Sequence, residues 1–92
     1  MCMGAERSER ELEKLLKAVA NKKRIAILRR LAAGSATVGE IARAIKLSMK
    51  ATSRHLQILS GAGYLSCDRQ SLFVHYKLDP SLDASRVLKV LF

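Results

Sequence analysis

The segment 47–65, LSMKATSRHLQILSGAGYL, combines side chains that bind polyanions with leucines that need an apolar core. It supplies two cations, Lys50 and Arg54, together with the amide of Gln57 and the hydroxyl of Ser53, and it contains no acidic residue. At 100° per residue, Lys50, Arg54 and Gln57 cluster on one side of a helix, with Ser53 at their edge. We call these four residues the reading face.

The opposite side of the same helix is apolar. With Thr52 at its centre, Leu56 and Leu59 lie within about 40° of the inward direction. The helix is therefore expected to pack on its own domain through this side and to turn the reading face outward. The alternative interpretation is an ordinary basic helix face that contacts only water.

The outward side chains match the hydrogen-bonding groups of DNA. Arg54 can donate two parallel hydrogen bonds to guanine O6 and N7, and Gln57 can pair with adenine N6 and N7. Ser53 suits a base or a phosphate, and Lys50 suits guanine or a phosphate. The backbone N–H groups near Ser48 can hold a phosphate at the helix N-terminus. The segment is therefore predicted to bind double-stranded DNA.

His55 invites a catalytic interpretation, because Ser53 and Ser60 are close to it in the sequence. No aspartate is placed to orient the imidazole, and a helix offers no oxyanion pocket. We expect His55 to lie at the edge of the apolar side, where it packs or reaches a phosphate. The sequence therefore predicts a protein that is not an enzyme.

Capping signals precede four helical segments: Ser8 with Glu11, Asn21, Thr37 with Glu40, and Ser48. They predict helices from residue 8, over 22–33, after residue 37, and over 48–60. The third and fourth helices are short and are separated by about three residues. This arrangement is a helix-turn-helix, whose second helix enters the DNA major groove.

After the fourth helix the apolar periodicity changes from 3.6 to 2, which indicates strands. Ranges 64–69 and 72–78 are predicted to form a hairpin with Gln70 and Ser71 near its turn. Asp79 and Pro80 can then open a last helix. The predicted fold is mainly α with a small β-hairpin, in the order α-α-α-α-β-β-α.

The length and the charge of the chain restrict its class. The chain has 92 residues, 17 Lys and Arg against 8 Asp and Glu, and a net charge of +9, and between residues 14 and 67 only Glu40 is acidic. One basic domain with a polyanionic partner follows. The chain contains no apolar run of the roughly 18 residues that cross a membrane and no signal-peptide core at its start. We therefore expect a cytoplasmic protein.

Three segments resemble the ArsR family of winged helix-turn-helix repressors: AVANKKRIAILRRL (18–31), SMKATSRHLQILSGAGYL (48–65) and FVHYKL (73–78). The resemblance extends over about residues 15–78, and its most specific part is 53–63. It implies a homodimeric repressor that binds a palindromic operator through helix 48–60 and contacts DNA with its hairpin, the wing. Arg69 remains available there for a phosphate or the minor groove, although Ser71 and Leu72 replace the usual wing-tip Gly and Arg.

In this family the first and last helices form the dimer interface. We expect a flexible start over residues 1–7 and one domain over 8–92, in which the resemblance implies terminal dimerisation helices. The apolar surface of the dimer would come from Leu12, Leu15, Leu16, Leu88, Leu91 and Phe92. The alternative is that both helices fold only onto their own domain.

The metal ligands of many family members are missing. Thr37 and Gly39 stand where a Cys-x-Cys pair would be, and the last segment offers Asp83 without a histidine. A zinc or soft-metal site needs three or four such ligands. We therefore predict no metal and no cofactor, and the sequence names no effector.

The two cysteines are too few for a disulfide scaffold. Cys67 could form half a metal site with His75, but it alternates with Leu65, so we expect a buried structural thiol. Cys2 falls in the flexible start, and no nearby pair indicates a redox switch.

Three other functions use the same features. A nonspecific architectural protein would bind DNA without a favoured sequence, and a winged-helix interaction module would present an apolar outer face. Binding to a membrane surface would need apolar residues free to insert, whereas those opposite the charges belong to a core.

Overall fold

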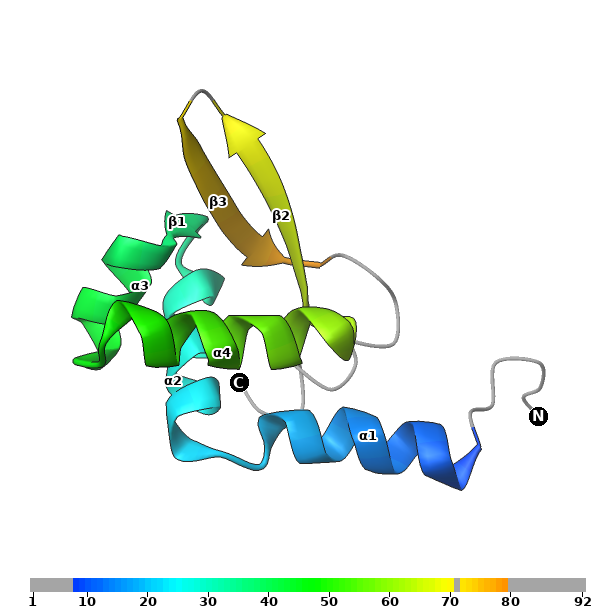
Figure 1. Ribbon diagram of the computed structural model, residues 1–92. Coiled ribbons are helices and arrows are strands. Elements are labelled where there is room, and N and C mark those ends of the chain that lie inside the picture. Colours follow the sequence, from blue (N-terminus) through cyan, green and yellow to red (C-terminus); the bar gives the residue numbers. More distant parts are fainter. Residues whose placement is uncertain (1–7, 71, 80–92) are drawn as a thin grey trace.

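The computed structural model describes residues 8–70 and 72–79 of the 92-residue chain. Its elements are α1 (Glu9–Val19), α2 (Lys22–Ala32), β1 (Ala36–Thr37), α3 (Val38–Ile45), α4 (Met49–Gly61), β2 (Leu65–Gln70) and β3 (Phe73–Leu78) (Figure 1). The predicted order of four helices and a hairpin is confirmed. The start over 1–7 and the last helix, including Leu88, Leu91 and Phe92, lie outside the described residues.

Two capping boxes start helices where the sequence places them. The Ser8 N–H donates to Glu11 Oε1 at 3.0 Å, and the Glu11 N–H donates to Ser8 Oγ at 3.3 Å. The same reciprocal pair joins Thr37 and Glu40, at 2.8 and 3.2 Å. Each pair satisfies backbone donors that have no partner within the helix, and so fixes the first residue of α1 and α3.

Single caps start the other two helices. Asn21 Oδ1 accepts from the N–H groups of Lys23 and Arg24 at 2.9 and 3.2 Å, and Ser48 Oγ accepts from the Ala51 N–H at 3.1 Å. Between α3 and α4 the chain turns at Lys46, whose φ of 56° is left-handed. This one residue ends α3 and lets α4 begin three residues later.

The helices enclose one apolar core. Its largest fully buried side chains come from α2, α3, α4 and the start of the hairpin: Ile27, Leu28, Ile41, Leu56, Leu59 and Tyr64. The Tyr64 hydroxyl donates to the Leu15 carbonyl at 2.8 Å, which ties α1 to the base of the hairpin. No helix among the described residues has the length and apolar character that a membrane crossing requires.

The sheet has three antiparallel strands in the order β1-β3-β2. The hairpin pairs Leu65 with Leu78 at its base and Gln70 with Phe73 at its tip. On the other side of β3, Ala36 and Thr37 pair with Tyr76 and His75. The two-residue strand β1 was not predicted from the sequence. It attaches the wing to the start of α3.

The exposed position of Cys67 contradicts the predicted buried thiol. Leu65, at the base of β2, is 4% exposed and belongs to the core. Two residues further on, the hairpin has left the helical body and projects away from it (Figure 1). Leu72, the first residue of the predicted second strand, instead lies in the turn and is 92% exposed. The alternation of a strand puts Leu65 and Cys67 on the same face of the sheet, but a side chain on that face is buried only where a helix or another layer packs against it.

The apolar face of α1 divides between two environments. Leu12 and Leu16 are 43% and 56% exposed, so they are available to a second subunit. Leu15, predicted for the dimer surface with them, is 6% exposed and belongs to its own chain's core. The prediction for Leu15 is wrong for a geometric reason. Adjacent residues of a helix point about 100° apart, so Leu15 points toward the body while Leu16 points outward.

Candidate nucleic-acid interface

Helix α4 has the two faces that the sequence predicts. Thr52, Leu56 and Leu59 are fully buried against the body. Lys50, Arg54 and Gln57 are exposed and Ser53 is half-buried, which confirms the outward orientation of the reading face.

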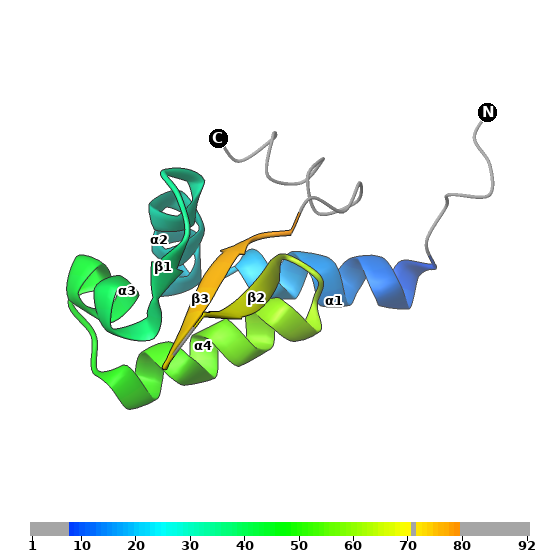
Figure 2. The same cartoon turned by 90° about the horizontal axis from the view of Figure 1, so that it is seen from above.

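The neighbours of α4 make it the second helix of a helix-turn-helix. It packs against α3 at its start and leads directly into the hairpin at its end (Figure 1). Seen from above, α4 lies along one side of the molecule with the hairpin beside it (Figure 2). The core therefore holds α4 on one side only, and its outer side is free to enter a DNA groove about 12 Å wide.

The first turns of α4 surround a shallow hollow. Ser48, Lys50, Ala51, Arg54 and His55 line it. Two cations and the N-terminal end of a helix meet there, and both attract anions. Lys50 and Arg54 have no acidic partner in the part of the chain that the structure describes. The hollow is therefore chemically suited to a phosphate of the DNA backbone.

His55 is half-buried between this hollow and α2. Its Nδ1 lies 3.3 Å from Nη1 of Arg24. Burial, followed by the charges of Arg24 and Arg54, lowers the pKa of His55 below its ordinary value. The lowered pKa favours the neutral imidazole, which can donate or accept a hydrogen bond without adding charge. Nothing in the local sequence connects residues 24 and 55, so sequence reasoning missed Arg24.

Arg69, the predicted wing contact, is exposed on β2 opposite Val74. It lies on the hairpin and does not line the hollow on α4. The structure thus offers two separate basic positions, one on the helix and one on the wing. The DNA contact of Arg69 stays a prediction.

The position of the family's Cys-x-Cys pair has a structural use here. Thr37 caps α3 with its side chain and pairs with His75 across the sheet. Within residues 8–70 and 72–79, no three His, Cys, Asp or Glu side chains come close enough together to hold a metal ion.

A helix-turn-helix, a cationic outer face on its second helix and an attached hairpin together define a winged helix-turn-helix DNA-binding protein. The comparisons with known proteins agree. Residues 21–66 match the model of the bacterial regulatory protein arsR family. The solved homodimeric winged helix-turn-helix DNA-binding domain of Mb0332 from Mycobacterium bovis superposes with a TM-score of 0.80 at 28% identity, covering 95% of this chain and 85% of that one.

Three curated relatives are transcriptional regulators. The regulator Rv2034 of Mycobacterium tuberculosis is 41% identical over 78% of this chain and 67% of its own length. The activator HlyU of Vibrio cholerae is 35% identical over 82% and 76%, and the repressor SdpR of Bacillus subtilis is 32% identical over 77% and 79%. The chain belongs to the arsR family of bacterial regulatory proteins. It is a DNA-binding transcriptional regulator, as predicted, and its family is not one of enzymes.

Proposed function

We propose that the protein is a cytoplasmic repressor that binds a palindromic operator as a homodimer. The observation that carries this proposal is the division of α4 into a fully buried side and an outward side with Lys50, Arg54 and Gln57. A helix of this kind, fixed by its core and free on its cationic side, suits the DNA major groove.

The side chains of α4 divide between base and phosphate contacts. Arg54 pairs with guanine, Gln57 pairs with adenine, and Ser53 and Lys50 contact a base or the adjacent phosphate. Ser48, at the N-terminus of α4, and His55 contact the phosphate in the hollow. On the wing, Arg69 adds a contact to a phosphate or the minor groove.

The dimer forms through α1. Leu12 and Leu16 expose their apolar side chains and line a shallow groove with Ala20. A chain of 92 residues buries only about 60–65% of its unfolded surface, so a second subunit adds useful core. The homodimeric state of Mb0332 supports the proposal. Leu88, Leu91 and Phe92 complete this interface in the proposal.

Selection of bound duplexes from a random pool, followed by titration at several salt concentrations, tests the proposal. We expect an enriched site of two inverted halves about one helical turn apart. Its log Kd should rise linearly with log salt concentration, because phosphate contacts release counterions. A normal salt slope without any enriched sequence would indicate an architectural protein, and a flat slope would exclude DNA as the partner.

The direction of regulation needs its own experiment, because SdpR is named a repressor and HlyU an activator. A reporter gene placed behind the selected duplex should lose expression when the protein is supplied. Increased expression would contradict the repressor assignment and leave DNA binding intact.

A further inference from the structure

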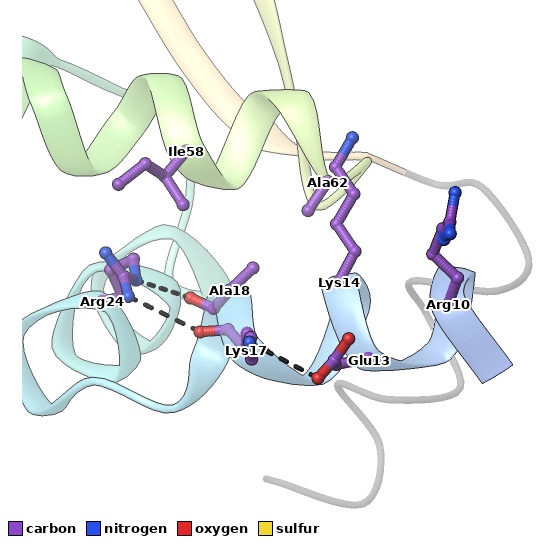
Figure 3. Close-up of a pocket in the computed structure, with 8 residues that line it drawn as sticks. All are labelled: Arg10, Glu13, Lys14, Lys17, Ala18, Arg24, Ile58 and Ala62. Atoms are coloured by element: carbon purple, nitrogen blue, oxygen red, sulfur yellow. Dashed lines mark hydrogen bonds and ion pairs between the residues drawn. The ribbon is translucent and has the colours of Figure 1, made fainter.

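Arg24 lies where three helices meet. It belongs to the first turn of α2 and is half-buried. Its Nε donates to the Ala18 carbonyl at 2.7 Å and its Nη2 to the Lys17 carbonyl at 3.5 Å, both near the end of α1 (Figure 3). Its Nη1 faces His55 Nδ1 on α4 at 3.3 Å. One guanidinium thus connects the proposed dimer helix to the helix that carries the reading face.

The carbonyls fix the guanidinium in place. The last carbonyls of a helix lack partners within it and carry partial negative charge, which favours a cation. Arginine can serve several acceptors at once because its donors form a rigid planar fork. Arg24 is therefore held by α1, and His55 meets a donor whose position is already set.

This contact decides which nitrogen of His55 carries the proton. An arginine side chain can only donate, so Nδ1 must accept and the hydrogen must be on Nε2. Among residues 8–70 and 72–79, the charged groups that face the ring are Arg24 from α2 and Arg54 and Lys50 from its own helix, and all are cations. They oppose a second proton on the imidazole, so the ring stays neutral.

We propose that Arg24 is a positioning residue for DNA binding, which holds His55 so that its Nε2–H donates to a phosphate oxygen in the hollow of α4. The proposal rests on the proposed function and adds a mechanism to it. Because the donor is uncharged, the contact strengthens binding without releasing a counterion. The contribution of His55 to affinity is therefore independent of salt concentration, whereas phosphate contacts of Lys50 and Arg54 weaken as the salt concentration rises.

The first test asks for the tautomer, without DNA. Nitrogen chemical shifts of the histidine rings, measured by NMR on the full chain, distinguish Nε2–H from Nδ1–H. We expect Nε2–H for His55, and in R24Q we expect a mixture of tautomers with a pKa closer to the ordinary value. The control K22Q removes the same charge from an exposed position on the same helix and should leave the ring unchanged. An Nδ1–H tautomer in the unmodified protein would overturn the proposal.

The second test uses the selected duplex as the probe and does not alter Arg24. In H55Q the side-chain amide reaches about as far as Nε2, whereas in H55N it reaches only as far as Nδ1. We expect H55N to weaken binding on the order of tenfold with an unchanged salt slope, since one hydrogen bond to a charged group is lost. H55Q, the conservative variant, should restore most of the affinity.

The outcomes separate this proposal from the one on which it rests. If H55N and R24Q bind as tightly as the unmodified protein while R54A binds weakly, the role of Arg24 is overturned and the DNA-binding function stands. If even the unmodified protein binds no duplex, both proposals fail together. If R24Q does not fold, the tautomer of His55 in the unmodified protein still tests the contact with Arg24, and the comparison of H55N with H55Q still tests the phosphate contact.

Discussion

Thr52 offers a sharp test of how α4 is held. It is fully buried at the centre of the inward side, and its Oγ1 has no hydrogen-bond partner among the described residues. A buried hydroxyl without a partner costs about 1–3 kcal/mol, because it has given up its hydrogen bonds to water. Valine has nearly the same shape and a similar helix propensity but no hydroxyl. We therefore expect T52V to stabilise the protein by about 1–2 kcal/mol.

Thr37 provides a matched control for the same substitution. Its hydroxyl accepts from the Glu40 N–H at 3.2 Å and caps α3. T37V removes that cap and should destabilise the protein by about 0.5–2 kcal/mol. The same substitution of threonine by valine is therefore expected to raise the stability at position 52 and to lower it at position 37, because only the Thr37 hydroxyl makes a hydrogen bond within the described residues.

Urea unfolding at one fixed protein concentration measures both variants, since the stability of a dimer depends on concentration. In a thermal scan, each kcal/mol should move the midpoint by about 4–8 °C for a domain of 60–100 residues. The reading face is untouched in T52V, so its affinity for the selected duplex should not change. A destabilised T52V beside the expected T37V would refute the reasoning, because it would mean that the Thr52 hydroxyl makes a stabilising hydrogen bond.

Three further predictions concern DNA, the dimer and pH. R54A should weaken operator binding by about 1–3 kcal/mol and reduce the salt slope by about one, and equal losses on all sequences would show that Arg54 contacts only phosphate. L16E places a charge on the exposed face of α1 and should yield monomers in sedimentation, whereas a persistent dimer would place the interface elsewhere. The backbone N–H of Thr37 lowers the pKa of Glu40, so this carboxylate stabilises α3 at neutral pH and loses that effect as the pH falls through its lowered folded-state pKa. In E40Q this part of the acid sensitivity should disappear from urea midpoints measured between neutral and acid pH, and an unchanged pH profile would contradict it.

The features that local sequence determines were predictable. Ser8, Thr37 and Ser48 bond to backbone groups three residues away, so the spacing of residue types is sufficient to locate the helix starts. The two faces of α4 follow in the same way from helical geometry. Hence the helix-turn-helix and its reading face could be read from the chain alone.

The features that depend on distant contacts were not predictable. β1 consists of Ala36 and Thr37 and exists because β3 lies beside it. Cys67 is exposed because the hairpin extends past the helices, and no spacing encodes where a core ends. The contact between Arg24 and His55 joins residues that are 31 positions apart. In each case the local sequence does not specify which other part of the folded chain a segment packs against.

The charges of the reading face are themselves an argument about its partner. A cation that serves the fold normally pairs with an acid or a carbonyl, as Lys23 and Arg24 do with carbonyls of Ile45 and Ala18. Lys50 and Arg54 have neither kind of partner among the described residues, although they are next to each other in the hollow. Like charges four residues apart on one helix face repel each other and destabilise the helix slightly. A bound anion offsets this repulsion. When the anion is the array of phosphates along DNA, the release of counterions adds to the free energy of binding.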